Sequence, residues 1–465
     1  MEALQRLHNR GSVSTGYDIE YSVKNEDANG ERFQSGSWFT NYSSTKTFTY
    51  SMWVKRTDLT TGTNYLLQYQ YNTGVGFSFG FAADNSTQAL YYLLQTSGTV
   101  YAYGKTTALY RDTSAWYHIV WRVDTTQATA ADRIRIYVNG VQQDLESGGN
   151  GHPAYPSQNY DAPLQTTQYV LGAGGTGGFC GYCSEYYFID GQSLEPTDFG
   201  EFDSATGIWK PIEYTGTFGN EGYYLDFADA SALGKDVSPN NQGNFSHYGG
   251  SSADQATDTP TNNFATYNIL NPTYGSCVIN EGATQIEGDS TSSFRNVQST
   301  LAVTSGKWYC ELVPQLASTM NTSFGVVNLD TAIFDTTWYN NAGYWGGNFD
   351  TGASIYFYTN GSGAGSEPVS FGGTVGLAFD ADNGTLDFYL NGSHQEQFTG
   401  IPSGTFAFFA DVQGTGNPYI RFNFGGYTVN TISSAASDAN DYGNFEYAPP
   451  TGYYALCTKN LAEFG

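Results

Sequence analysis

Basic residues are scarce in this sequence: Lys and Arg number 18 among 465 residues, against 44 Asp and Glu, so the formal net charge is -26 at pH 7. Proteins that bind nucleic acid use Lys and Arg to displace the counterions of the phosphate backbone. The scarcity therefore argues against a nucleic-acid partner. The same excess of negative charge disfavours direct attraction to an anionic membrane surface.

Cysteine is scarce as well. Five cysteines in a chain of this length do not make a disulfide framework, and the odd number leaves at least one thiol free or paired between chains. Cys180 and Cys183 form a C-x-x-C motif, but no second pair or histidine at ligand spacing completes a zinc site. The residues after Cys183, SEYYFIDG, are typical of a strand, whereas a thioredoxin-type motif leads into a helix. We therefore predict neither a metal nor a redox function for this motif.

Long apolar runs are absent. No segment approaches the roughly 20 apolar residues that span a bilayer, and the N-terminal MEALQRLHNRGS has no apolar core or cleavage pattern of a signal peptide. We therefore expect no membrane insertion and synthesis in the cytosol. Leu4 and Leu7 would lie on one side of a short amphipathic turn that is not stable alone. Two interpretations stay open: a frayed terminus, or an anchor that becomes ordered only against a partner.

Glycine and aromatic residues are abundant instead, with 56 Gly, 38 Tyr and 30 Phe against only 14 Pro. The clearest pattern is Gly373 to His394, where apolar residues alternate with period two before Asn391-Gly392. Asn and Gly tolerate the positive φ that a two-residue type I′ hairpin turn needs. A weaker copy at Arg133 to Gln142 contains Asn139-Gly140. The repeated hairpin and the chain length predict two antiparallel β-sandwiches.

Alternating apolar residues and frequent turn signals predict further strands through both halves of the chain. In the first half they are 48–54, 65–71, 76–81, 90–95, 100–103, 116–124, 168–171 and 185–189. In the second half they are 276–280, 306–313, 322–327, 354–358, 404–412 and 419–424. The chain is therefore predicted to be all-β, with Trp53, Trp116, Trp121 and Trp308 as structural residues of these strands.

Several motifs of the first half resemble one known family. FTYSMWVKR, WYHIVWRVD and RIRIYVNGV are followed by EYYFIDGQSLEPTDFGEFD and YYLDF. On these motifs, residues 16–229 resemble a laminin-G-like domain of the concanavalin A-like lectin/glucanase superfamily, in the form carried by bacteriophage virion proteins. The resemblance implies a β-sandwich and, as in many such domains, a loop rim where Asp and carbonyl oxygens hold Ca²⁺.

The second half resembles a SPRY domain over residues 263–465, through GKWYCELVP, VGLAFDADNGTLDFYLNG, FAFFADVQGTGNPYIRFNFG and GYYALCTKNL. This resemblance implies a second concanavalin A-like sandwich, in tandem with the first, with a ligand-binding loop rim and no catalytic chemistry. Residues 230–262 are poor in apolar residues and rich in Ser, Asn, Gly and Asp, so we predict a linker that can lay extended segments on a neighbouring domain. Residues 1–15 are the N-terminal segment that holds the candidate virion anchor, Leu4 and Leu7.

No catalytic constellation stands out. A retaining glycosidase needs two carboxylates about 5 Å apart, and the nearest glucanase-like pattern, Glu201-Phe202-Asp203, lacks the second glutamate and runs into Gly207. None of the five histidines stands near a Gly-x-Ser-x-Gly elbow. His118, inside WYHIVW, is best interpreted as a hydrogen-bonded strand residue. We predict no catalytic residues and no enzymatic activity.

Calcium is the one cofactor that the acidic composition favours. Asp380 to Asp387 begins like an EF-hand loop, but Gly384 and Asn391 stand where such a loop needs an oxygen ligand and a bidentate Glu. An Asx turn within a hairpin is the better interpretation. We therefore predict no resident cofactor and no metal ligands, while a Ca²⁺ ion at a loop rim stays compatible with the composition.

One aromatic segment, Ile333 to Asp350, has no strand period. Sugar recognition uses flat aromatic faces together with amide and carboxylate groups, and the SPRY resemblance assigns this region to the binding rim. The alternative is a loop that plugs one end of the sandwich with its own aromatic side chains. The candidate ligand-binding residues are Trp338, Tyr339, Asn341, Tyr344, Trp345 and Asn348.

These resemblances imply a bacteriophage virion protein, a tail fibre or related appendage whose loops adhere to a host-surface glycan without catalysis. The expected partners are other virion proteins, a host-surface glycan or protein, and further copies of the chain, with a trimer inferred by analogy. The expected location is the virion, assembled in the host cytoplasm. Two alternatives stay open: a capsid- or tail-decorating protein that binds only other virion proteins, and a polysaccharide-cleaving glycoside hydrolase.

Overall fold

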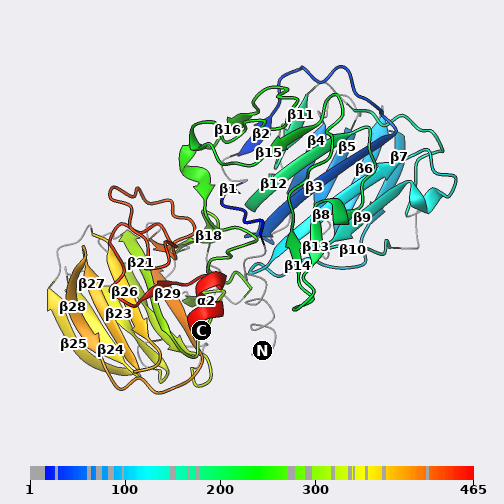
Figure 1. Ribbon diagram of the computed structural model, residues 1–465. Helices are drawn as coiled ribbons and strands as arrows, with labels where there is room; N and C mark the ends of the chain where they lie inside the picture. Colours follow the sequence, from blue (N-terminus) through cyan, green and yellow to red (C-terminus); the bar gives the residue numbers. More distant parts are fainter. Residues whose placement is uncertain are drawn as a thin grey trace. The chain divides into compact units, whose positions relative to one another are not determined.

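The computed structural model describes residues 16–26, 30–59, 64–69, 76–81, 88–96, 99–146, 153–164, 167–172, 178–270, 278–288, 296–315, 320–332, 338, 341–350, 354–368, 373–414 and 418–465. The chain divides into two compact units, with the boundary between Thr261 and Asn262. Each unit has two layers of largely antiparallel β-sheet, which confirms the prediction of an all-β chain with two sandwiches (Figure 1). Within the described ranges, no helix is long and apolar enough to cross a membrane.

The N-terminal unit contains two sheets, named N1 and N2. In N1 the strand order is β10 (Val141–Gln142), β9 (Ile134–Val138), β8 (Trp116–Asp124), β3 (Thr47–Arg56), β12 (Gly181–Asp190), β1 (Ser22–Asn25), β17 (Gln255–Ala256), and β15 (Tyr223–Leu225) also pairs with β12. In N2 it is β16 (Ser246–Tyr248), β2 (Arg32–Gln34), β11 (Gln168–Val170), β4 (Asn64–Tyr69), β5 (Gly76–Phe81), β6 (Leu90–Thr96), β7 (Thr99–Lys105). A separate ribbon pairs β13 (Gly200–Phe202) with β14 (Trp209–Pro211), and the short 3₁₀ turns are Ala130–Asp132, Pro196–Asp198, Ala230–Ala232 and Ser252–Asp254.

The core of the N-terminal unit lies between N1 and N2. The apolar residues of β3 that alternate in the sequence, from Phe48 to Val54, are buried there. Trp121 of β8 stacks on Phe79 of β5, with ring centroids 4.7 Å apart and ring planes 9° apart. This stacking joins the two layers, and it confirms the structural role predicted for Trp121. Trp53 and Trp116 are also buried.

The segment predicted to be a linker belongs to the N-terminal unit. Its β16 pairs with β2 at the edge of N2, and its β17 pairs with β1 at the edge of N1. Asp258 is buried and accepts a hydrogen bond from the ammonium of Lys55 at 2.7 Å. Residues 230–261 therefore complete both sheets, whereas low apolar content had indicated a separate linker with extended segments.

The C-terminal unit contains sheets C1 and C2. In C1 the strand order is β18 (Val278–Asn280), β19 (Gln285–Glu287), β30 (Tyr419–Asn423), β21 (Lys307–Gln315), β26 (Val375–Asp380), β27 (Thr385–Leu390), β28 (Ser393–Phe398), and β31 (Tyr454–Ala455) also pairs with β21. In C2 it is β20 (Asn296–Gln298), β29 (Phe406–Gly414), β22 (Met320–Asn328), β23 (Tyr344–Asp350), β24 (Ser354–Thr359), β25 (Ser362–Pro368). A short helix, α2 (Thr458–Phe464), ends the chain (Figure 1).

Both predicted hairpins are confirmed. Asn391 and Gly392 have φ of 49° and 75°, as a type I′ turn requires, and Asn139 and Gly140 have φ of 47° and 78°. The Asx turn is also confirmed, because the Asp380 carboxylate accepts the backbone N–H groups of Asp382 and Asn383 at 3.1 and 2.9 Å. Local turn chemistry therefore sets the register of β26, β27 and β28.

The residues after Cys183 lie in a strand, as predicted, because β12 extends to Asp190. Cys180 and Cys183 are both buried thiols that form no disulfide with a described residue, and Cys183 is within β12. Residues three apart on a strand point to opposite faces, so the two thiols do not share a site. Cys277 lies outside the described residues.

Candidate ligand-binding pocket

A pocket of about 230 Å³ lies on the outer face of sheet C1. Along β21 the side chains of Trp308, Cys310 and Leu312 point into the core between the sheets, so the intervening Glu311 points away from it. The floor of the pocket comes from β21 and β30, one wall from the ends of the β26–β27 hairpin, and the other from two loops that follow β30. The lining residues are Glu311, Val313, Gly373, Thr374, Asn391, Asn423, Asn430, Thr431, Ile432, Glu446 and Tyr447.

Glu311 holds the loop wall in place. Its Oε2 accepts the backbone N–H of Glu446 at 2.8 Å, and its Oε1 accepts the backbone N–H of Tyr447 at 2.8 Å. The Tyr309 hydroxyl donates to the same Oε1 at 3.2 Å. Burial raises the pKa of Glu311, although these hydrogen bonds oppose that shift. Glu311 is therefore a bound acceptor that fixes the main chain of the opposite wall.

Glu446 ties the two loops of this wall together. Its carboxylate accepts both the backbone N–H and the hydroxyl of Ser433. The hydrogen bond from the Ser433 hydroxyl is the main reason that the pKa of Glu446 is lowered. The loop wall thus has its shape before any ligand binds, which lowers the ordering cost of binding.

A glycine in the β27–β28 turn lets the Tyr447 ring approach the hairpin wall. A Cβ atom at Gly392 would lie 2.6 Å from Cδ1 of Tyr447, so only glycine lets this ring lie against the turn. The Asn391 carbonyl oxygen Oδ1 accepts the backbone N–H of Thr374 at 3.0 Å, which closes the end of the hairpin. On the floor, Asn423 donates its Nδ2 to the carbonyl of Asn444 at 2.7 Å. These hydrogen bonds fix the main chain around the hairpin wall and the floor.

The predicted aromatic rim is placed differently. Trp338, Tyr344, Trp345 and Asn348 are all buried, with 0%, 1%, 4% and 7% of their surface exposed. Trp338 and Tyr344 pack on the outer face of C2, and Trp345 points into the core between the sheets. Their prediction as exposed rim residues is wrong, because Tyr344, Trp345 and Asn348 belong to strand β23 and not to a loop.

The remaining predicted positions divide into two groups. Asn341 is half-buried, and its backbone N–H donates to the carbonyl of Trp338 at 3.0 Å. Tyr339, Leu4 and Leu7 lie outside the described residues. The candidate virion anchor therefore stays a prediction.

Sequence reasoning missed the pocket because its residues come from separated segments. One signal was available: Glu311 stands inside the strand pattern of GKWYCELVP, on the face opposite to Trp308, Cys310 and Leu312. A carboxylate in the middle of a strand, beside an otherwise apolar pattern, indicates a polar contact on the second face. The loop residues that complete the site carry no comparable pattern.

His118 of β8 is a structural residue, as predicted. The Trp209 indole N–H donates to Nδ1 of His118 at 2.9 Å, so the neutral ring carries its proton on Nε2 and donates it to the Ser51 hydroxyl at 2.9 Å. A histidine in this tautomer does not accept the serine proton, as a nucleophilic site would require. Burial lowers the pKa of His118 to about 3, which keeps the ring neutral.

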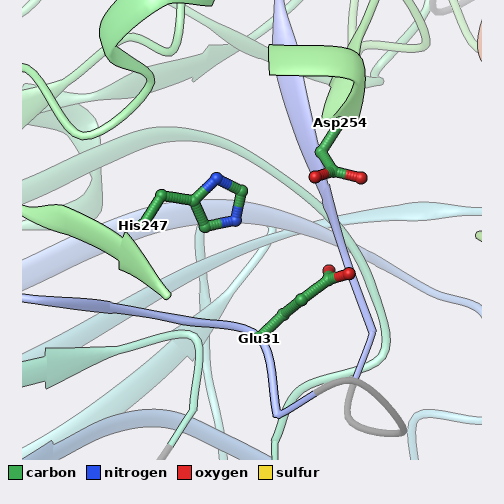
Figure 2. A group of neighbouring side chains, drawn as sticks. All are labelled: Glu31, His247 and Asp254. Carbon is green, nitrogen blue, oxygen red and sulfur yellow. The ribbon is translucent and has the colours of Figure 1, made fainter. Parts of the chain in front are cut away.

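One group of side chains in the described ranges has the composition of a metal site. Figure 2 shows Glu31, His247 and Asp254 with their polar ends directed toward one another, and their ligand atoms lie within 4.8 Å of one another. The ammonium of buried Lys24 lies 3.2 Å from Glu31 and 3.0 Å from Asp254. Lys24 is thus the cation that pairs with these carboxylates, and we assign no metal here.

One protein-family model matches residues within the N-terminal unit. Residues 27–178 match the family model Laminin_G_3, described as the concanavalin A-like lectin/glucanases superfamily. This agrees with the domain type predicted from the motifs of the first half. Comparison with the curated proteins finds no matching sequence.

Solved structures similar to the chain include SPRY domains. The SPRY domain of human HERC1 is 15% identical, with 34% of this chain and 96% of that domain covered and a TM-score of 0.29. The PSpry domain of TRIM65 is 15% identical, with 34% and 91% covered and a TM-score of 0.28. The stonustoxin structure is 14% identical, with 34% and 28% covered and a TM-score of 0.28.

Proposed function

We propose that this chain is a bacteriophage virion protein, a tail fibre or related appendage, that binds a host-surface glycan without breaking a bond. The observation that carries the proposal is the preformed pocket on C1. Its lining combines amides, hydroxyls and carboxylates with the ring of Tyr447, which is the mixture that sugar hydroxyls and C–H faces require. The lectin/glucanase family match of residues 27–178 is compatible with carbohydrate binding.

The virion setting rests on the motifs of the sequence, and it includes assembly with other virion proteins and with further copies of the chain as a trimer. Fold by itself does not assign function, so the proposal depends on the pocket. Mass measurement of the purified chain in solution tests the trimer separately from ligand binding.

The experiment measures binding of the full chain to cells and purified surface polysaccharides from a panel of bacteria. We expect binding to at least one host, with competition by its soluble polysaccharide. Tyr447→Ala and Glu446→Gln should weaken that binding about tenfold, the loss expected for one or two ligand contacts. Glu463→Gln is the matched control, because Glu463 is exposed on α2 and does not line the pocket. Adhesion that survives both pocket variants would exclude this pocket, and binding only to virions that lack the protein would favour a decorating protein.

A glycoside hydrolase is the second candidate, because Glu311 and Glu446 line the same pocket and their pKa values are shifted in opposite directions. Such a pair is typical of an acid and a nucleophile. However, each oxygen of Glu311 accepts a backbone N–H, a pairing that favours the ionised form over a proton donor. Release of reducing ends from a bound polysaccharide, abolished by Glu311→Gln, would establish hydrolysis in place of simple binding.

A further inference from the structure

The pocket on C1 carries negative charge that no basic side chain balances. Glu311 and Glu446 both line it, and none of its lining residues in the described part of the chain is Lys or Arg. Neither carboxylate takes part in an ion pair within the described ranges. Repulsion from Glu446 contributes to the raised pKa of Glu311. The two charges therefore act on whatever enters the pocket.

The groups that bind these carboxylates are all neutral. Glu311 accepts from two backbone N–H groups and the Tyr309 hydroxyl, and Glu446 accepts from the backbone and hydroxyl of Ser433. Hydrogen bonds from neutral donors stabilise the ionised form without cancelling its charge. An anionic ligand would meet like charge in a partly enclosed site, where screening by water is reduced.

Other polar side chains of the pocket are free to bind a ligand. Within the described residues, the Asn391 Nδ2 group, the side-chain amide of Asn430 and the Thr374 and Thr431 hydroxyls make no hydrogen bond. They offer donors and acceptors to ligand hydroxyls, and Tyr447 offers a ring face. At about 230 Å³ the pocket is below the roughly 300–1,000 Å³ of pockets for drug-sized ligands, so it suits one sugar ring.

We propose that this pocket binds a single sugar unit that bears no acid group, that a free amino group on the sugar strengthens binding, and that uronic and other acidic sugars are rejected. This inference rests on the proposed glycan-binding function and names the class of sugar at that same site. Rejection of acidic sugars would follow from like charge, and preference for the amine from its attraction to the same two carboxylates.

The test compares four monosaccharides on the full chain, by ligand-observed NMR titration near neutral pH, where much of the amine is protonated and the raised pKa of Glu311 removes less of its charge than at acidic pH. The four sugars are glucose, N-acetylglucosamine, glucosamine and glucuronic acid. Each of the last three differs from glucose in one substituent. We expect glucosamine to bind about fivefold more tightly than glucose and glucuronic acid about fivefold more weakly, the size of one solvent-screened charge contact. High salt should reduce both differences. Equal or tighter binding of glucuronic acid, or no binding of any of the four, would overturn the inference.

Two Glu→Gln variants, each of which removes one negative charge, test whether the preference among the sugars arises in this pocket. Glu446→Gln keeps an acceptor for Ser433 and removes one charge, so glucosamine should lose most of its advantage over glucose, and glucuronic acid should gain. Glu463→Gln removes one exposed charge from the same unit outside the pocket, and the order of affinities should persist. An order that is the same in both variants contradicts the assignment to this pocket.

Failure of the inference and failure of the proposed function give different results. Adhesion to cells that is blocked best by an acidic polysaccharide would retain the function and exclude the inferred sugar class. Charge-ordered monosaccharide binding without adhesion to any bacterium would retain the inference and exclude the virion adhesin. Circular dichroism of each variant confirms that a lost affinity is not lost folding.

Discussion

Trp338 is fully buried, and its indole packs against the rings of Tyr358 and Phe409 with centroids 5.4 and 5.2 Å apart. Replacing such a tryptophan with alanine removes its apolar contacts and leaves a cavity, at a typical cost of about 3–5 kcal/mol. We expect Trp338→Ala to lower the free energy of unfolding of the C-terminal unit by about that amount, measured by urea denaturation.

The control is Tyr356→Ala, because Tyr356 is an aromatic residue of the same sheet with 39% of its surface exposed. Surface substitutions of this kind usually change stability by about 0.5 kcal/mol or less. If both variants unfold at the same urea concentration, Trp338 is not a core residue.

His118 provides a prediction about pH. Its pKa is about 3 in the folded state because of burial, against about 6.5 in an unfolded chain. Below pH 6.5 the unfolded chain binds a proton that the folded chain does not, so stability falls as pH falls, by about 1.4 kcal/mol per pH unit down to the folded pKa. Above pH 6.5 the contribution of His118 to the free energy of unfolding no longer changes with pH.

The measurement compares the wild type with His118→Gln by denaturation at pH 7 and pH 4.5. Glutamine accepts from Trp209 and donates to Ser51 without titrating, so the variant should lose less stability on acidification than the wild type. The carboxylates titrate equally in both proteins and cancel in the difference. Equal losses would mean that His118 is not held neutral.

At the scale of elements, the β27–β28 turn tests whether one glycine shapes the pocket. Gly392→Ala adds a Cβ that meets Tyr447, in a residue with φ of 75°. Gly400→Ala places alanine at nearly the same φ, 74°, but nothing lies within 4 Å of its Cβ. Both variants should lose about 1–2 kcal/mol of stability to the left-handed backbone.

Only the first variant should move the Tyr447 ring. We therefore expect Gly392→Ala to shift the NMR signals of the Tyr447 ring and to weaken glycan binding. Gly400→Ala should do neither. Loss of binding in both variants would indicate general destabilisation of the unit, and the assigned role of Gly392 would be wrong.

The elements that sequence predicted well are those set by local rules. β26, β27 and β28 follow from alternation and an Asn-Gly turn, whose conformations depend on adjacent residues. β23 was missed because its glycines indicate a loop. A Cβ at Gly346 would lie 2.2 Å from the carbonyl oxygen of Phe324, and one at Gly347 would lie 2.9 Å from Ile355. These glycines serve close packing inside C2, which only the tertiary structure reveals.

The pocket is even harder to predict from local sequence patterns than β23. Glu311 on β21 and Glu446 on a late loop are brought together by the backbone hydrogen bonds of the loop. Composition and periodicity describe each segment alone. They therefore indicated the aromatic residues of segment 333–350 as ligand-binding residues, although these side chains are buried in the fold. Polar residues paired across long sequence separations escape such reasoning.

At the scale of the whole molecule, the end of the N-terminal unit is fixed by a buried ion pair. Lys55 and Asp258 have 0% and 1% of their side-chain surface exposed and lie 2.7 Å apart, and the Trp116 indole N–H donates to Asp258 at 3.0 Å. Burial lowers the pKa of Lys55, and Asp258 opposes that shift. The pair attaches the residues after β17 to N1, just before the boundary at Thr261.

Removing one member of a buried ion pair leaves an uncompensated charge, which typically costs about 3–5 kcal/mol. We therefore expect Asp258→Asn to destabilise the N-terminal unit by that amount and to increase hydrogen exchange of β17 and its neighbour β1. The matched control is Asp161→Asn, since Asp161 pairs with Lys46 at 3.9 Å with 67% of its side chain exposed. Exposed pairs contribute about 0–1 kcal/mol, so this variant should behave as the wild type. Equal exchange of β17 in both variants would mean that the β-ladders alone hold this segment to the sandwich and that the Asp258 ion pair does not contribute.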